Sequence, residues 1–333
     1  MRERNESVYN GAMYVARQAG WLSFLFEGRV LPHIWGRVIV TTALSVGVTA
    51  IAELTPAFKH HHLTLVPFTL IGVPLGIFLG FRNNTSYDRF WEGRRLWGSL
   101  VNTSRSLGRQ ILTLVEASAL YNADEPEVGV TSSNPEIATF QREMVYRLIA
   151  FVHALRLHLR GQPFDELSKY LSEAELKALA KERNVPTAIV HAMGHEFQRA
   201  WHRGWIHPQH LPVMEASLAQ ITDIQGACER IKSTPIPYSY TVLMHRIVGA
   251  YCLLLPFGAV DQTKLFPPLV VLFMSYAFFG LDAIGSEVED PFGLDANDLP
   301  LSALSTTIEI NLRQRLGETE LPAAPTPVDR VLR

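Results

Sequence analysis

Two long stretches of this 333-residue chain are almost free of charge, and this feature constrains its fold most strongly. Residues 34–81 and 236–285 together comprise 98 residues with only seven charged side chains, whereas the other 235 residues carry 55. A helix that crosses a membrane needs about 20 mainly apolar residues, so each stretch is long enough for two crossings. The sequence therefore predicts an all-α, multipass membrane protein with four transmembrane helices per subunit and a helical cytosolic domain, and it disfavours a soluble enzyme.

The apolar stretches divide into four predicted spans that form two helical hairpins. The spans are residues 34–54, 63–81, 240–260 and 265–284. Arg37 and Glu53 lie near the two ends of the first span, where long charged side chains can reach the interface. The second span has nineteen residues without a charge, and Pro67 and Pro74 are expected to bend or loosen it.

The regions outside the hairpins are rich in charge. Residues 82–235 contain 18 basic and 17 acidic side chains, and apolar residues recur there at helical spacing. The clearest helical stretches are 140–160, 167–183 and 211–232. The predicted segments are an N-terminal cytosolic segment at 1–33, a cytosolic helical domain at 82–235, an acidic segment with a C-terminal helix at 286–316, and a flexible, proline-rich tail at 317–333.

Basic residues gather on the side of the membrane opposite the short hairpin loops. They are Arg29, Arg37, Arg82, Arg89, Arg94 and Arg95. Because cytoplasmic segments carry an excess of Lys and Arg, we expect both termini and the large domain to be cytoplasmic, at the inner (cell) membrane. The first 20 residues lack a continuous apolar stretch, so no cleaved signal peptide is expected. The net charge of -2 gives no general reason to bind nucleic acid.

Two stripes of residues spaced by four lie side by side on the second span. One stripe is Gly72, Gly76 and Gly80, and the other is Val73, Ile77 and Phe81. Small residues let a neighbouring helix approach closely, whereas an apolar stripe could project toward an oligomer axis and gate water by dewetting. The spacing alone leaves both helix packing and a pore open, and packing is the commoner explanation.

Several charged residues invite either a functional or a structural interpretation. Arg246 lies in the third span, where a cation is costly unless it is paired or faces water. It is therefore either a functional charge or a structural one, paired with Asp282. Glu92 lies three residues from both Arg89 and Arg95 and could pair with either within one helix.

Oxygen ligands cluster after the fourth span. The candidate calcium ligands are Glu287, Asp290, Asp295 and Asp298. Calcium binds six to eight oxygens, although acidic turns are often only solvated helix caps. His60, His61 and His62 are a weak metal signal, since adjacent imidazoles do not share a helix face. The two cysteines, Cys228 and Cys252, exclude a thiolate cluster, and no catalytic motif for phosphate binding, zinc proteolysis or a serine nucleophile occurs.

Four segments resemble the bestrophin family, particularly its bacterial branch. They are PFTLIGVPLGIFLGFRNNTSYDRFWEGRRLWGSLVNTSR at 67–105, IPYSYT at 236–241, LLLPFG at 253–258 and EVEDPFGLDANDLPL at 287–301. The resemblance implies a homopentameric ion channel in membrane lipid, with small inorganic ions as its cargo and the pore on the fivefold axis. By resemblance, Val73, Ile77 and Phe81 form the pore neck, and Leu211, or Gln209 in the other register, forms a cytosolic aperture. The acidic cluster matches the calcium ligands of animal bestrophins, so calcium is the one cofactor suggested.

These observations lead to a channel hypothesis and to a competitor from another class. The channel passes small monovalent ions, with a lean to anions such as chloride, and a sodium or potassium channel of the same architecture is the alternative. The competitor is a membrane-anchored interaction protein whose spans pack through the glycine stripe. A secondary transporter is disfavoured because the two hairpins show no obvious internal repeat. The gating stimulus stays open.

Overall fold

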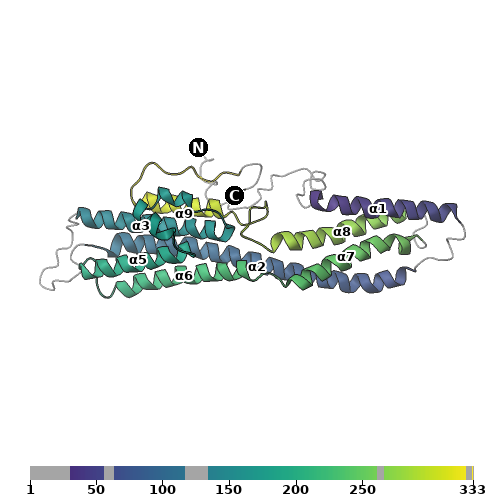
Figure 1. Cartoon of the computed structure of the whole chain (residues 1–333), viewed down its shortest axis with the longest axis horizontal. Coiled ribbons are helices and arrows are strands. Elements are labelled where there is room, and N and C mark those ends of the chain that lie inside the picture. Colours follow the sequence, from purple (N-terminus) through teal and green to yellow (C-terminus); the bar gives the residue numbers. More distant parts are fainter. Residues whose placement is uncertain (1–30, 56–63, 117–133, 261–265, 328–331, 333) are drawn as a thin grey trace, which may run out of the picture.

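The computed structural model describes residues 31–55, 64–116, 134–260, 266–327 and 332, and within these ranges the chain is helical, without a β-sheet. The helices are α1 (Leu31–Leu54), α2 (Leu65–Leu114), α3 (Pro135–Arg160), the 3-10 helix η3 (Asp165–Lys169), α4 (Glu173–Leu179), α5 (Val185–His202), α6 (Leu211–Ser233), α7 (Tyr238–Ala259), α8 (Pro267–Val288) and α9 (Leu301–Arg315). Figure 1 shows an elongated molecule, with α1, α7, α8 and the first part of α2 at one end and the remaining helices at the other.

Four helices in the described ranges are long and apolar enough to cross a membrane: α1, α2, α7 and α8. They coincide with the four predicted spans, so the all-α multipass prediction is confirmed. The side chains that these helices bury against one another form a modest apolar core, which includes Leu75, Leu79, Val248 and Val271. Much of the rest of their apolar surface is exposed, as expected for helices that face lipid.

The second span does not end at residue 81. It continues as one 50-residue helix, α2, through the polar residues that follow it, with Pro74 inside the helix. At 1.5 Å per residue such a helix is about 75 Å long. Figure 1 shows α2 running through both halves of the molecule, so the boundary placed at 81/82 from the sequence falls within a continuous element.

The half of the molecule away from the membrane helices has α3 at its centre, and we call it the cytosolic half after the location that the sequence predicts for it. All ten residues from Leu148 to Leu157 are buried, as expected for a helix covered on every side. The start of α3 is fixed by Asn134, whose side chain accepts a hydrogen bond from the backbone of Glu136, and Pro135 occupies the first turn. It ends at Gly161, which adopts a left-handed conformation with a φ of 61°.

Two predictions for the cytosolic half need correction. The predicted helix over 167–183 is divided into η3 and α4, because Ser172 and Glu175 form a capping box that begins a new helix. The described part of the tail has no helix, in agreement with the prediction. Its first residues, however, are fixed by side-chain contacts. Glu318 accepts hydrogen bonds from Tyr146 of α3 and Arg313 of α9, so the flexible tail does not begin at residue 317.

Candidate ion pathway

The membrane part of α2 has one buried and one exposed apolar face. Val73, Ile77 and Phe81 are 66%, 52% and 60% exposed. Leu75 and Leu79 are buried in the core formed with α7 and α8. Residues two positions apart lie about 200° apart around a helix. The stripe predicted to be a pore neck therefore points away from the other helices of its own subunit.

The glycine stripe has a packing role at one position only. A Cβ atom at Gly72 would lie 2.7 Å from the hydroxyl oxygen of Tyr251, so a side chain at this position would require the Tyr251 ring of α7 to shift. At Gly76 and Gly80 the space around an added Cβ is open to 4 Å. The predicted packing stripe is thus limited to Gly72 within the chain, because the helix turns its other two glycines away from α7.

A buried ion pair lies directly after the predicted neck. Arg82 and Asp282 are each 1% exposed, and the guanidinium Nη1 donates to Oδ1 of the carboxylate at 2.7 Å. The other carboxylate oxygen, Oδ2, lies 2.6 Å from Nδ1 of His245 and 3.9 Å from Nη1 of Arg37. The four residues come from α2, α8, α7 and α1, so the carboxylate of α8 contacts side chains of the other three membrane helices.

Close approach of α8 to α2 makes this arrangement possible. A Cβ at Gly285 would lie 2.2 Å from Oδ1 of Asn83 and 3.9 Å from the Arg82 guanidinium carbon, so a side chain here would displace the Asn83 amide. Arg82 also donates to the hydroxyl of Ser286 at 2.7 Å. With these bonds Arg82 is held on both sides, which fixes the rotation of α2 and the direction in which Phe81 points.

Asp282 does not pair with Arg246, contrary to the pairing considered from the sequence. His245 lies on the side of α7 that meets the carboxylate, and Arg246, about 100° further around the helix, is exposed. The partner is Arg82, which in the sequence stands out only as a basic residue near a span. A long-range pair of this kind leaves no local spacing signal.

A second group of contacts joins α2 to the ends of α6 and α8. The guanidinium of Arg89 donates to the backbone carbonyls of Ile231 at 2.6 Å, of Glu289 at 3.1 Å and of Thr234. Glu92 accepts from Arg230 of α6 at 2.6 Å. The predicted pairing of Glu92 with Arg89 or Arg95 is therefore wrong, because α6 supplies a closer cation.

The two aperture candidates lie at the start of α6, at the end of the helix away from α7. Leu211 is the first residue of α6 and is partly buried against the cytosolic core. Gln209 is exposed in the preceding turn, where its backbone N–H donates to Nδ1 of His207 at 3.2 Å. Figure 1 shows α6 running beside the second half of α2 and back toward the membrane helices.

Comparison with known proteins identifies the family. Residues 13–314 match the family described as Bacterial/Fungal Bestrophin protein. The chain belongs to the bestrophin family. It is 36% identical over 320 residues to the voltage-dependent anion channel-forming protein YneE of Escherichia coli K12, covering 95% of this chain and 98% of that one. A protein described in the same way from Ralstonia nicotianae is 36% identical over 313 residues, covering 93% and 96% of the two chains.

Solved bestrophin structures have the same fold. The crystal structure of a bacterial bestrophin homolog from Klebsiella pneumoniae superposes with a TM-score of 0.77 at 32% identity, covering 86% of this chain and 100% of that chain. The family resemblance predicted from the sequence is thereby confirmed.

In this bestrophin the acidic segment after α8 makes contacts with neighbouring side chains. The described residues contain no group of three or more His, Cys, Asp or Glu side chains placed to hold one metal ion. Glu287 instead accepts from the side-chain amide of Asn297 at 2.8 Å, and Asp290 pairs with Lys232 at 2.7 Å. His60, His61 and His62 and the residues before 31 lie outside the described ranges.

Burial sets the chemistry of two other groups in the cytosolic half of this bestrophin. Burial raises the pKa of Asp298 to about 7, and repulsion by Asp295, Asp290 and Glu287 adds to the effect. Burial also raises the pKa of the Cys228 thiol to about 12, which leaves it protonated and unreactive at neutral pH. The unreactive Cys228 thiol agrees with the sequence, in which neither cysteine belongs to a functional motif.

Proposed function

We propose that this bestrophin is the subunit of a channel that passes small monovalent anions such as chloride. The observation that carries the proposal is the exposed stripe of Val73, Ile77 and Phe81, opposite the buried face of α2. A single helix cannot enclose a pore, so the stripe requires several copies of the chain around one axis. The homopentamer implied by the family resemblance supplies them. The names of the relatives, voltage-dependent anion channel-forming proteins, support anions over cations.

The proposed mechanism depends on hydration rather than on bond making. Rings of Val73, Ile77 and Phe81 form an apolar neck in which water is unstable, so ions cross only when the neck is wide enough to stay wet. The contacts of Arg82 with Asp282 hold α2 at the rotation that points these rings toward the axis. Membrane lipid surrounds the outer faces of α1, α7 and α8.

The proposal also places a second constriction and an orientation. The aperture lies at the start of α6, formed by Leu211 or by Gln209. The side that carries Arg82, Arg89 and the cytosolic helices faces the cytoplasm of a cell with the protein in its inner membrane, together with both termini. The excess of basic residues beside the spans supports this orientation.

Ion flux into liposomes that contain the purified protein tests the neck. Replacing Phe81 with Ala is expected to raise chloride flux several-fold, because the smaller side chain widens the apolar ring. Phe273→Ala is the matched control, since Phe273 is a phenylalanine of α8 with 63% exposure, close to the 60% of Phe81. Equal flux from the two variants and the parent protein would contradict the neck.

The same liposomes test ion sign and aperture. With chloride as the sole permeant ion the parent protein is expected to conduct, and with sodium or potassium as the sole permeant ion it is expected not to. Leu211→Ala and Gln209→Ala are then compared for the ratio of bromide to chloride flux. A change confined to one of them identifies the aperture residue, and no flux of either sign would favour the membrane-anchored interaction protein.

A further inference from the structure

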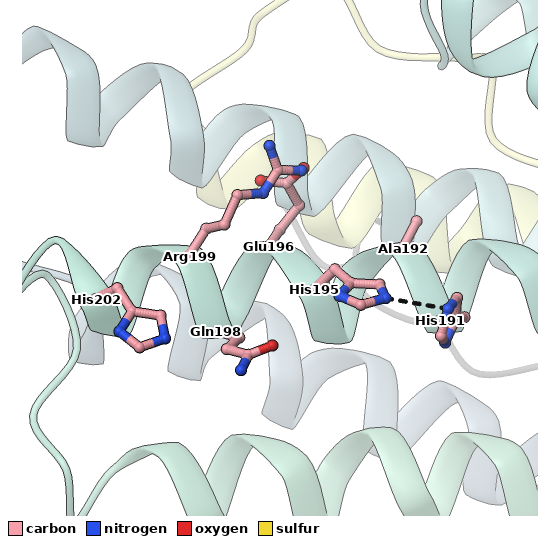
Figure 2. A pocket seen from close by; sticks show the side chains of 7 residues that line it. All are labelled: His191, Ala192, His195, Glu196, Gln198, Arg199 and His202. Carbon is pink, nitrogen blue, oxygen red and sulfur yellow. Dashed lines mark hydrogen bonds and ion pairs between the residues drawn. The ribbon is translucent and has the colours of Figure 1, made fainter.

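Helix α5 carries two histidines one turn apart that point toward each other. His191 and His195 are both exposed, and their Nε2 atoms lie 3.1 Å apart. Figure 2 shows the two rings meeting at these nitrogens along one side of a surface pocket. A second pocket that both histidines line also includes Leu211, a candidate for the proposed aperture, but the proposed ion passage assigns no role to the histidines.

The spacing of the two nitrogens suits a transition metal. Zinc binds imidazole nitrogen at about 2.0–2.1 Å. Two nitrogens 3.1 Å apart would then subtend an angle of about 98° at a shared metal, between octahedral and tetrahedral values. Because both rings are exposed, their side chains can rotate so that both lone pairs face the metal. Imidazole suits zinc, copper and nickel rather than calcium or magnesium.

A carboxylate on the neighbouring helix can supply a third ligand. Glu215 of α6 lines the same pocket as His191 and His195. Its Oε1 lies 3.9 Å from the position of a Cβ at Gly194, the residue directly before His195, so its carboxylate lies beside the pair. No three such ligands are already in place in the described part of the chain. Rotation of the exposed Glu215 side chain would complete the set, with water in the remaining positions.

The arginine that lines the pocket of Figure 2 does not oppose metal binding. Arg199, one turn further along α5, forms an ion pair with Glu196. Figure 2 shows these two side chains together, away from the meeting point of the histidine rings. From this geometry we propose that His191 and His195, with Glu215, form a binding site for a divalent transition metal of the zinc class.

A bound metal would connect α5 to the first turns of α6. Glu215 lies four residues after Leu211, so it is one turn from the proposed aperture. If the proposed channel function holds, metal occupancy fixes the start of α6 and changes ion flux. This consequence rests on the proposed function, whereas metal binding itself does not.

Calorimetric titration of zinc into the full-length protein tests the site. The protein is purified without a polyhistidine tag and with His60, His61 and His62 replaced by Ala, so that these residues do not bind the metal. The expected result is one zinc per chain. His191→Ala or His195→Ala should weaken binding at least 10-fold and Glu215→Gln about 3-fold. His202→Ala is the matched control because it removes a histidine of the same helix and pocket.

The outcomes separate the two proposals. Unchanged zinc affinity in His195→Ala, or an equal loss in His202→Ala, would overturn the metal site. Cobalt absorption provides a second readout, since its visible bands differ between protein-bound cobalt and the hydrated ion, and the difference should disappear in His191→Ala. Zinc binding without any ion flux in liposomes would refute the channel function and leave the metal site intact. Ion flux without zinc binding would refute the metal site and leave the channel function intact.

Discussion

Ten consecutive residues of α3, Leu148–Leu157, are buried in the cytosolic half, whereas buried residues in the described membrane-embedded segments occur at most two in a row. Water surrounds the cytosolic half, so burying apolar surface there drives folding. In a membrane the lipid is as apolar as the side chains, and burial gives little net gain. There the Asp282 carboxylate of α8, in contact with side chains of the other three membrane helices, specifies which faces meet. The comparison teaches that apolar packing stabilises one half and polar contacts specify the other.

The strongest way to break the comparison is to remove the buried carboxylate. Asp282→Ala leaves Arg82 buried without its partner, which should cost about 3–5 kcal/mol and prevent assembly of the membrane half. Thermal unfolding in detergent, followed by size-exclusion chromatography, measures the loss. The matched control is Arg246→Gln, which removes an exposed charge one helix away. Similar stability for the two variants would show that Asp282 does not organise the helices.

A matched pair of core substitutions compares the halves directly. Leu148 and Leu79 are both fully buried, the first in the cytosolic half and the second in the membrane half. Leu148→Ala should cost about 3 kcal/mol, from lost transfer energy plus a cavity. Leu79→Ala should cost roughly half as much, because lipid removes the transfer contribution. Thermal unfolding of both variants in the same detergent measures the two losses. An equal or larger loss for Leu79→Ala would show that apolar packing does not stabilise the cytosolic half more than the membrane half.

The acidic segment after α8 gives a prediction in pH. Because the folded pKa of Asp298 is raised to about 7, its contribution to stability is full below its unfolded pKa, near 4, and is lost as the pH rises through 7. Asp298→Asn has no carboxyl group to ionise, so the variant does not lose this stability as the pH rises. The variant should be more stable than the parent by about 1–2 kcal/mol at pH 8 and equal to it at pH 4. Unfolding midpoints across this range provide the measurement, and a constant difference would refute the assignment.

The smallest effect is expected from an exposed ion pair. Lys177 and Glu173 pair at 2.7 Å on α4, with side chains 76% and 83% exposed. Glu173→Gln should cost no more than about 0.5 kcal/mol, since solvent screens both charges. The difference between the stability losses of Glu173→Gln and Asp282→Ala, in the same unfolding assay, measures how much more a buried charge pair contributes than an exposed one. A loss of several kcal/mol in Glu173→Gln would show that burial makes no such difference.

The parts of the fold that could be predicted from the sequence are those set by local composition. Nineteen uncharged residues before Arg82 are enough to predict a membrane span, because backbone groups in lipid must bond within the helix. The neck stripe was likewise visible as a spacing of four, and its exposure on α2 follows from the helical period. The break before α4 also had a signal, the pair Ser172 and Glu175, but helical spacing over 167–183 concealed it.

The rest depended on contacts between residues far apart in the sequence. Arg82 and Asp282 are separated by 200 positions, and nothing near either residue indicates which cation the carboxylate meets. Arg246 was a reasonable candidate by depth, yet the rotation of α7 turns it outward. Similarly, the continuity of α2 beyond residue 81 is stabilised by Arg89 and its contacts with α6 and α8 rather than by local propensity.

Because α2 is one continuous helix held at Arg82, its two parts on either side of Arg82 act as a lever with arms of unequal length. Arg82 is held at a fixed point, about 13 Å from Val73 on one side and about 48 Å from Leu114 on the other. A tilt of about 5° around this fulcrum would move the helix near Val73 by about 1 Å and its far end by about 4 Å. Small movements near Val73 are thereby magnified at the distant end of the helix. Conversely, a force applied at the distant end acts on the proposed neck with a mechanical advantage of about 3.5.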